Sequence, residues 1–307
     1  MEGITDETYR LAIMKAFPEW DYYGVDFLRV PSVGHYKDDF ILEHFGKSIY
    51  SNKSLKDKTI FQILTSEKSN TEYTVKQIEN LNIDWLDLNL GCPSKTVNSH
   101  GGGAFLLSKH TILRKIIRTI RNNFSKRFTV KIRVGYKSDE NFLDSLKLFE
   151  DEGVDAITIH ARTRDQLYKG IANWDYLKQA TEFSNLPIIG NGDVWTTTDY
   201  NNFYKKTNCH SLMMARGALK TPWMASLLKS RIDENDLIEL RKQQIKKYFT
   251  YLSEEFINKG LNEKTTLKRF KSFSRYPFDD FKNGTEIKSN ILRTQSLEDF
   301  LNTLSNI

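Results

Sequence analysis

Two residues that could carry out chemistry lie in or directly after short apolar segments. Lys131 lies within FTVKIRVG, and Cys92 follows WLDLNL in the turn Asn-Leu-Gly-Cys-Pro. A buried ammonium requires a negative or electron-rich ligand, because a buried polar group without a partner costs about 1 to 3 kcal/mol; the alternative is a lysine that reaches water at a strand end. A thiol is mostly protonated at neutral pH, so Cys92 could donate a proton. It could also act as a nucleophile beside a base such as His160 or His100.

Two short turns could bind a phosphate group. Asn191-Gly192-Asp193 and Ala215-Arg216-Gly217 follow two successive apolar segments. Small residues let backbone N–H groups approach a phosphate, and an arginine can add a two-pronged contact. Each motif alone most often marks a turn, but the pair favours a cofactor that carries a phosphate.

A third group of polar residues extends this set. Gln62 lies within an apolar segment, and His160-Ala161-Arg162 ends another, with Tyr168 shortly after. Tyr168 and Arg162 could stack on a base or pair with a phosphate. Local packing of these two side chains and a structural role for His160 are equally open alternatives.

Seven apolar segments alternate with helical ones and position these residues. We predict strands at Gly24–Val30, Thr59–Thr65, Trp85–Leu90, Phe128–Val134, Ala156–His160, Pro187–Gly190 and Ser211–Ala215, and helices that include Ile112–Asn122 and Asn141–Glu152. We interpret the strands as near-continuous apolar runs, as expected where both faces are covered. This alternation predicts a (β/α)8 TIM barrel, in which the polar residues meet at the carboxyl end of the strands. The first of the eight strands is missing from the chain. Gly101-Gly102-Gly103 is predicted to be a flexible loop that leads into a helix at Ala104.

The cysteine content and the hydropathy exclude several classes of protein. Cys92 and Cys209 are the only cysteines, which excludes a disulfide scaffold and a four-cysteine zinc module. Cys209 is interpreted as an inert buried thiol. No segment reaches the roughly 18 to 20 apolar residues of a membrane span, and the first residues do not resemble a signal peptide. We expect a soluble cytoplasmic protein without a metal.

The positive charge is concentrated near the end of the chain. The 307 residues carry a net charge of +6, and residues 1–240 hold 32 basic and 31 acidic side chains, whereas residues 241–307 hold 13 and 8. Apolar residues recur at helical spacing from just before this region into it, at Ile238, Leu240, Ile245, Tyr248, Phe249 and Leu252. We therefore predict a catalytic domain over 1–240 and a basic helical domain over 241–307. Such a module fits a phosphate-rich partner, and a lysine-rich solvated helix face is the alternative.

The central motif resembles that of a known family. GCPSKTVNSHGGGAFLL, residues 91–107 with Asn89 before it, is similar to the signature of the tRNA-dihydrouridine synthases, and GCPSKTVN followed by GGGA resembles the bacterial C-type subgroup. MEGITD, FQIL, VKIRVGY, HARTRDQLY, NGDVW and MMARGAL recur in the order found in this family. The resemblance covers essentially the whole chain.

The resemblance implies a fold and a reaction. It implies an FMN-dependent barrel followed by a helical domain that binds tRNA, acting as a monomer. NADPH would reduce the flavin, and the flavin would pass a hydride to C6 of a uracil flipped out of the tRNA D-loop, with Cys92 protonating C5. The C-type subgroup would act on uridine 16.

The resemblance also implies roles for individual residues. Those at the flavin-binding positions are Met1, Gln62, Lys131, His160, Asn191, Gly192, Asp193, Ala215 and Arg216. Those at positions that meet the substrate base or the tRNA are Arg29, Asn89, Tyr168, Lys268, Arg269, Lys271 and Arg275.

The chain departs from the family pattern at two places. The family carries a hydrophobic strand ending in Ala-Pro before the Met-Glu-Gly that opens this chain. We therefore expect Met1 to be an internal methionine and the natural protein to extend further; if the chain is complete, an open barrel and weak flavin retention are expected. Ala215 stands where C-type enzymes commonly have glycine, with little effect expected because only its backbone N–H is needed.

Two other functions fit parts of the sequence. A flavin barrel that reduces a free small molecule, similar to dihydropyrimidine dehydrogenase, would share the flavin site but would give no role to the basic helices. A tRNA-binding or folding factor without enzymatic activity would be favoured if the missing strand abolished flavin binding. Truncation after residue 240 is predicted to spare a small-molecule enzyme, and a yellow purified protein argues against the folding factor.

Overall fold

The computed structural model describes residues 3–229 and 237–307, which form two compact units. The first unit contains Tyr22–Val194 and Thr198–Met214 together with the N-terminal residues up to Ile4. The second contains Thr5–Asp21, Trp195–Thr197 and Ala215–Ile307. The predicted contact of Met1 lies outside the described residues. The predicted domain boundary after residue 240 falls inside a helix, α13 (Leu237–Asn258).

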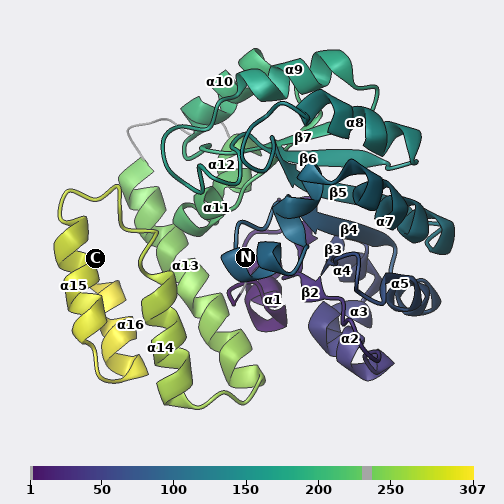
Figure 1. The fold of residues 1–307 in the computed structure, drawn as a ribbon. Coiled ribbons are helices and arrows are strands. Elements are labelled where there is room, and N and C mark those ends of the chain that lie inside the picture. The colour runs from purple at the N-terminus through teal and green to yellow at the C-terminus, as the bar shows by residue number, and fades with distance from the viewer. Residues whose placement is uncertain (1–2, 230–236) are drawn as a thin grey trace. The chain divides into compact units, whose positions relative to one another are not determined.

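A parallel sheet forms the centre of the first unit (Figure 1). Its strands are β1 (Tyr23–Gly24), β2 (Leu28–Arg29), β3 (Thr59–Leu64), β4 (Trp85–Leu90), β5 (Arg127–Arg133), β6 (Ala156–His160), β7 (Ile188–Asn191) and β8 (Ser211–Met213). The strands from β3 to β8 pair in chain order, and β1 and β2 both pair with β3. In the described residues β8 has no pairing with β1 or β2. The parallel β/α barrel fold is confirmed, with a sheet that stays open.

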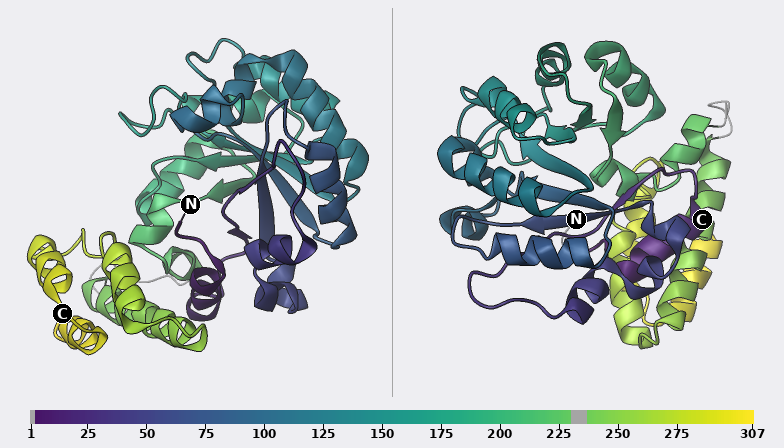
Figure 2. Two further views of the ribbon diagram at one scale, coloured as in Figure 1. Left: turned by 60° about the horizontal axis from the view of Figure 1, so that its bottom comes forward. Right: turned by 90° about the vertical axis from the view of Figure 1, so that its right-hand side faces the viewer.

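Helices follow the strands and lie outside the sheet (Figure 2). They are α2 (Asp38–Phe45), α3 (Lys47–Tyr50), α4 (Lys53–Lys56), α5 (Thr71–Asn80), α6 (Lys95–Ser99), the 3-10 helix η1 (Gly103–Ser108), α7 (His110–Asn123), α8 (Phe142–Asp151), α9 (Asp175–Phe183) and α10 (Thr197–Thr207). The predicted helices at Ile112–Asn122 and Asn141–Glu152 correspond to α7 and α8. The alternation of strand and helix explains why all the strands are parallel.

Strands β4 and β5 are not near-continuous apolar runs, so the prediction was wrong for these two strands. In β4 the fully buried Leu86, Leu88 and Leu90 alternate with Asp87 and Asn89. In β5 Phe128, Val130 and Ile132 alternate in the same way with Thr129, Lys131 and Arg133. Successive side chains of a strand point to opposite faces, so each of these strands has one apolar and one polar face. The polar face is the one that carries the candidate site.

Two further predictions need correction. The single strand expected at Gly24–Val30 is broken into β1 and β2, because Asp26 leaves the ladder: its carbonyl accepts a hydrogen bond from the His44 ring (2.7 Å). Gly102 and Gly103 of the glycine run are closely packed, and the helix that follows is a 3-10 helix starting at Gly103 instead of Ala104. A Cβ on Gly102 would lie 2.9 Å from the Thr65 carbonyl oxygen, so a side chain does not fit there.

The second unit is helical. It contains α1 (Glu7–Ala16), α11 (Arg216–Lys220), α12 (Met224–Lys229), α13, α14 (Glu263–Phe273), α15 (Gly284–Arg293) and α16 (Leu297–Ser305). Its core is aromatic, with Phe249, Phe256, Phe270 and Phe300 fully buried. Helix α1 joins this core, since the rings of Tyr9 and Phe273 are 5.2 Å apart. None of the helices in the described residues is long and apolar enough to span a membrane.

Candidate active site at the carboxyl ends of the strands

Three predicted site residues meet on neighbouring strands of the first unit. Gln62 on β3, Asn89 on β4 and Lys131 on β5 are all half-buried. Asn89 and Lys131 are direct partners in the register of β4 and β5, and the Asn89 Nδ2 donates to Gln62 Oε1 (2.8 Å). The sequence therefore placed these three residues together correctly.

A buried carboxylate that the sequence analysis did not single out lies below them. Asp87 is 4% exposed and accepts hydrogen bonds from the Gln62 Nε2 (2.7 Å) and from the Thr129 hydroxyl (2.6 Å). Burial raises the pKa of Asp87 to about 6, against the effect of these two donors and of the Lys131 charge. Burial, with the nearby Arg133 charge, lowers the pKa of Lys131 to about 8, while the Asp87 and Cys92 charges oppose this shift. Between about pH 6 and pH 8 both groups are therefore mainly charged.

Lys131 retains hydrogen-bonding capacity toward a ligand. In the described part of the chain, no hydrogen bond or ion pair is assigned to its ammonium group, which has three donors. A half-buried cation of this kind fits an electron-rich ring or a developing negative charge.

Cys92 lies on a loop held by three side chains from different parts of the chain. It is 8% exposed, and its carbonyl accepts from the Asn98 Nδ2 (2.9 Å). Asn98 also accepts from the Phe105 N–H (2.8 Å), while the Arg133 Nε donates to the Gly91 carbonyl (3.0 Å). Asn89 completes the set by accepting from the Gly91 N–H (3.0 Å). The loop is thus fixed on both sides of the cysteine.

The two histidines considered as bases for Cys92 both have other contacts. The His100 ring bonds to the Thr96 carbonyl (2.6 Å), and the His160 Nε2 lies 3.3 Å from the Arg162 Nη1. Proton donation by Cys92 needs no such base. The choice between an acid and a nucleophile for Cys92 stays a prediction.

The ends of β6 and β7 form a second part of the candidate site. His160 and Asn191, each 7% exposed, are register partners, and the Asn191 Nδ2 donates to the Met213 carbonyl (2.8 Å). Gly192 has φ +130°, and a Cβ there would lie 2.7 Å from the Ala172 Cβ. Only glycine fits this conformation and this spacing.

Asp193 is engaged within the protein. Its carboxylate pairs with the guanidinium of Arg162, which is 1% exposed, and also accepts from the Ala172 N–H (2.7 Å). Arg162 donates in addition to the Gly170 carbonyl (2.6 Å). Arg162 therefore has the local packing role that the sequence left open, and Asp193 shapes the loop.

Tyr168 is exposed at the same end of the strands. Its side chain is 55% exposed, and its ring lies 5.5 Å from the Arg133 guanidinium and 6.4 Å from the His160 ring. Arg133, which the sequence analysis also missed, thus contacts both the Tyr168 segment and the Cys92 loop. It donates to the Leu167 carbonyl (2.8 Å) as well as to Gly91.

The predicted phosphate residues at the start of α11 belong to the second unit. Ala215 precedes this helix and Arg216 is its first residue. The Arg216 guanidinium lies 5.1 Å from the centre of the Trp195 ring. Their role toward a phosphate stays a prediction.

The predicted tRNA contacts divide into exposed and internally engaged residues. Arg29 is exposed over the Phe27 ring in the first unit, and Lys268 and Arg275 are exposed in the second. Arg269, in contrast, pairs with Asp6 and stacks 4.7 Å from the Phe256 ring. The Lys271 ammonium donates to the Thr294 carbonyl (2.6 Å). Arg269 and Lys271 therefore stabilise the second unit directly.

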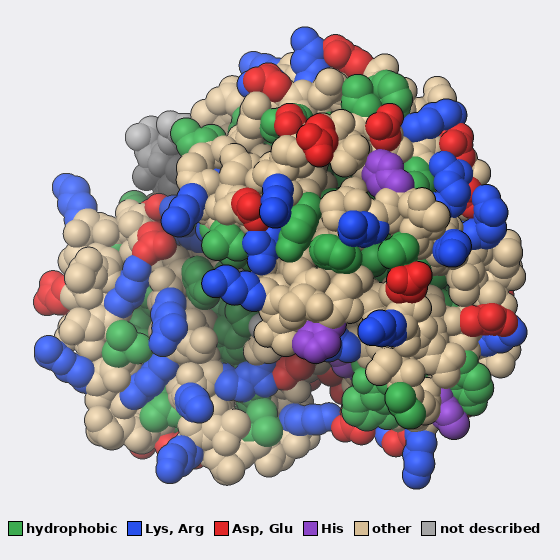
Figure 3. Space-filling model, in the orientation of Figure 1, with side chains coloured by type: hydrophobic (Ala, Val, Ile, Leu, Met, Phe, Trp, Pro, Cys, Tyr) green, Lys and Arg blue, Asp and Glu red, His purple; other side chains and the backbone are tan. Residues whose placement is uncertain are grey.

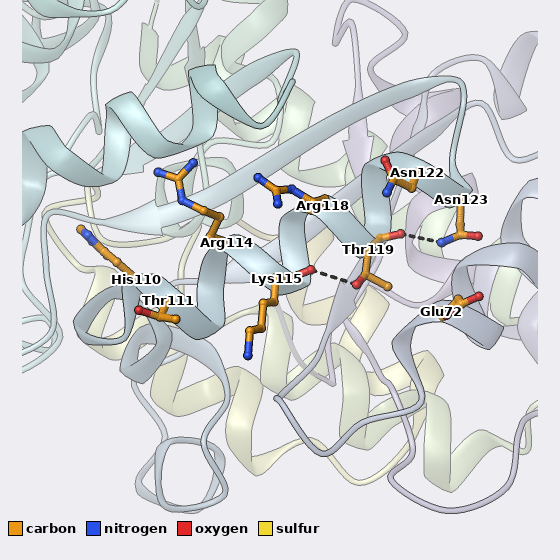
Figure 4. Close-up of a pocket in the computed structure, with 9 residues that line it drawn as sticks. All are labelled: Glu72, His110, Thr111, Arg114, Lys115, Arg118, Thr119, Asn122 and Asn123. Atoms are coloured by element: carbon orange, nitrogen blue, oxygen red, sulfur yellow. Dashed lines mark hydrogen bonds between the residues drawn. The ribbon is translucent and has the colours of Figure 1, made fainter.

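A polar pocket on the outer helices is not a second candidate for the active site. It has a volume of about 820 Å3 and is lined mainly by α7, including His110, Arg114 and Arg118 (Figure 4). The two arginines already pair with Glu152, at 2.6 and 2.8 Å, and none of the lining residues lies at the end of a strand. In the described ranges, no three histidine, cysteine or acidic residues are placed to hold a metal.

Comparison with known proteins agrees with this geometry. The family model described as dihydrouridine synthase (Dus) matches residues 1–304. The chain belongs to the dihydrouridine synthase family. The resemblance seen in the sequence is thereby confirmed, and so is the prediction that the chain is an oxidoreductase that modifies tRNA.

Several relatives have named activities. A tRNA-dihydrouridine(16) synthase of Neisseria meningitidis serogroup B is 26% identical over 276 residues, 89% of this chain and 82% of the relative. One of Pseudomonas syringae is 31% identical over 231 residues, 73% of this chain and 71% of the relative. A tRNA-dihydrouridine synthase B of Pasteurella multocida is 33% identical over 154 residues, 50% of this chain and 46% of the relative.

Solved structures of other proteins share the fold. A 2-naphthoyl-CoA reductase complex superimposes with a TM-score of 0.57 at 8% identity over 73% of this chain, and a histamine dehydrogenase from Rhizobium sp. 4-9 with 0.53 at 12% identity over 81%. The matched regions cover 46% and 47% of those chains, so the dihydrouridine synthase chain spans about half of their length.

Proposed function

We propose that this dihydrouridine synthase reduces uridine 16 in the D-loop of tRNA to 5,6-dihydrouridine, with FMN as cofactor and NADPH as reductant. The observation that carries the proposal is the meeting of Gln62, Asn89 and Lys131 at the carboxyl ends of adjacent strands, with Cys92 on the following loop. The position 16 follows the names of the relatives from Neisseria and Pseudomonas.

The residues present suit a flavin. Gln62 and Lys131 offer donors to an electron-rich ring, and His160, Asn191 and Gly192 would line its other side. Asp193 would act indirectly, because its carboxylate is occupied by Arg162 and would repel a phosphate. When bound, FMN would supply the hydride that adds to C6 of uracil.

The chain itself would supply the proton. Transfer of the Cys92 thiol proton to C5 completes the addition of two hydrogens across the C5–C6 bond and leaves a thiolate. Water would then reprotonate the thiolate. Asn89 would orient the base through its remaining N–H.

The basic helices have a role in this scheme. A uridine within a folded tRNA must be extruded before it can react, at a cost of a few kcal/mol that backbone contacts have to offset. Lys and Arg side chains are spread over the visible face of α13 to α16 (Figure 3). They would supply such contacts, and binding would weaken steeply with salt.

Reversing two exposed charges should weaken tRNA binding. For Lys268→Glu with Arg275→Glu we expect at least about a tenfold loss of affinity for unmodified tRNA and a shallower dependence on salt, because two phosphate contacts are lost. A filter-binding or anisotropy titration at several salt concentrations measures both.

The matched control has the same change in net charge. Lys53→Glu with Lys178→Glu alters two lysines of the first unit whose side chains are 91% and 56% exposed. We expect its affinity to stay within about twofold of the wild type. Equal losses in both double variants would indicate a general charge effect and would remove Lys268 and Arg275 from the interface.

The proposal is tested by reconstitution. Purified protein is incubated with FMN, NADPH and unmodified tRNA, and dihydrouridine is measured by nucleoside mass spectrometry. Formation of dihydrouridine in tRNA but not from free uracil or uridine is the expected result. Reduction of the free pyrimidines alone would support a small-molecule enzyme, and tRNA binding without FMN binding would support the folding factor.

A further inference from the structure

Asp87 is a buried charged group to which the proposed reaction gives no role. It lies on β4, two residues before Asn89, on the polar face of the sheet. Both of its carboxylate oxygens are engaged, Oδ1 by the Thr129 hydroxyl and Oδ2 by the Gln62 amide. Burial of a carboxylate is costly, so its surroundings point to what it does.

The hydrogen bonds around Asp87 form two chains in which each donor points toward the Asp87 carboxylate. On one side the Trp85 Nε1 donates to the Thr129 hydroxyl (2.9 Å), which donates to Asp87. On the other side the Gly91 N–H donates to Asn89, Asn89 donates to Gln62, and Gln62 donates to Asp87. An ionised carboxylate can only accept hydrogen bonds, so it determines the direction of the whole chain.

This direction decides what the site offers to a ligand. The Oε1 of Gln62 accepts from Asn89 and the Oδ1 of Asn89 accepts from Gly91, and each amide nitrogen uses one N–H within the protein, which leaves each residue one N–H for a ligand. The neighbouring Lys131 adds only donors. The three side chains can therefore bind the carbonyl oxygens of a dioxopyrimidine ring, which both flavin and uracil possess.

We propose that Asp87 is a positioning residue that makes this part of the site present N–H donors to a ligand, by fixing the amides of Gln62 and Asn89 and by placing a negative charge near Lys131. The proposal rests on the proposed function, because it concerns how the same site selects its ligands.

Two substitutions separate the two effects of Asp87. Asp87→Asn removes the negative charge but keeps an oxygen that can accept from Gln62, whereas Asp87→Leu removes both. Thr129→Val is the matched control, because it deletes the other hydrogen bond to Asp87 and leaves Gln62, Asn89 and Lys131 in place. FMN itself is the probe, and its affinity for the flavin-free protein is measured by quenching of flavin fluorescence.

We expect Asp87→Asn to weaken FMN binding at pH 8 by about tenfold, Asp87→Leu to weaken it further, and Thr129→Val to change it by less than about threefold. Thermal unfolding of each variant shows whether it is folded. If Asp87→Leu does not unfold cooperatively, the proposal is tested by the FMN affinities of Asp87→Asn and Thr129→Val alone. Wild-type affinity in Asp87→Asn, or equal losses in Asp87→Asn and Thr129→Val, would overturn the proposal.

The pH dependence is a second readout that a purely structural role would not move. FMN affinity of the wild type should fall as pH rises through about 8, where Lys131 loses its charge. The charges that act on Lys131 are those of Arg133, Asp87 and Cys92, so the series is repeated in Cys92→Ser to exclude the thiol. In Asp87→Asn the fall should begin at lower pH, and an unchanged midpoint would contradict the role of Asp87. A wild type that binds no FMN at any pH would refute the proposed function instead.

Discussion

Replacing Cys92 by alanine is expected to slow dihydrouridine formation in tRNA by about 10² to 10⁴-fold, the range typical for loss of a general acid. Reduction of bound flavin by NADPH should be unaffected, because the thiol would act only after the hydride has been delivered. Single-turnover mixing of the reduced enzyme with tRNA measures the first rate, and flavin absorbance measures the second. The backbone contacts of this loop come from Asn98 and Arg133, so the loop should keep its conformation in the variant.

The second cysteine provides the control. Cys209 is 5% exposed, and burial raises the pKa of its thiol, as expected for an inert packing residue. Cys209→Ala should therefore retain turnover within about twofold. Unchanged tRNA turnover in Cys92→Ala would remove Cys92 from the mechanism.

Replacing Arg162 by methionine is expected to lower the free energy of unfolding by about 3 to 5 kcal/mol, because it leaves the Asp193 carboxylate without its cation in a largely buried position. The side chains are 1% and 16% exposed. Arg162 also holds the Gly170 carbonyl, so the segment that carries Tyr168 should loosen. Chemical denaturation measures the free energy, and proteolysis within residues 163–172 measures the loosening.

Two further variants test this explanation. Arg162→Met combined with Asp193→Asn should recover much of the loss, because the unpaired charge is removed. Arg118→Met should lower the free energy of unfolding far less than Arg162→Met, since Arg118 is 61% exposed and Glu152 keeps its contact with Arg114. A loss below about 1 kcal/mol in Arg162→Met itself would show that the buried pair does not stabilise the loop.

Local sequence patterns were sufficient to predict most strands of the sheet. The strands at Trp85–Leu90 and Ala156–His160 have the predicted bounds, because each is a short segment rich in large apolar residues between polar turns. The polar residues at their ends were placed correctly for the same reason, since parallel strands bring their carboxyl ends to one edge. Cys92, Asn89 and Lys131 follow from this rule without any knowledge of the family.

Other features depend on contacts between residues distant in sequence. Asp87 and Arg133 were missed because β4 and β5 were interpreted as continuously apolar; the two-residue alternation would have assigned both to the polar face. Asn98 was visible only as part of a motif, and its bond to the Cys92 carbonyl depends on the fold of the intervening turn. The break between β1 and β2 depends on His44, 18 residues after Asp26.

The packing of helix α1 within the second unit also depends on residues distant in sequence. Its apolar spacing predicts a buried face but does not identify the partner, which is α13, more than 200 residues away. Lys15 pairs with Glu255 across these helices. Truncation after residue 240 would cut α13 and expose α1, so charge reversal at Lys268 and Arg275 is the cleaner test of tRNA binding.

The central claim is tested most directly by mapping dihydrouridine in tRNA from cells that lack this chain. Nucleoside and fragment mass spectrometry should show loss of dihydrouridine at position 16 alone, restored by the wild-type gene but not by Cys92→Ala. Dihydrouridine that persists at position 16, or that is lost only at another position, would contradict the account.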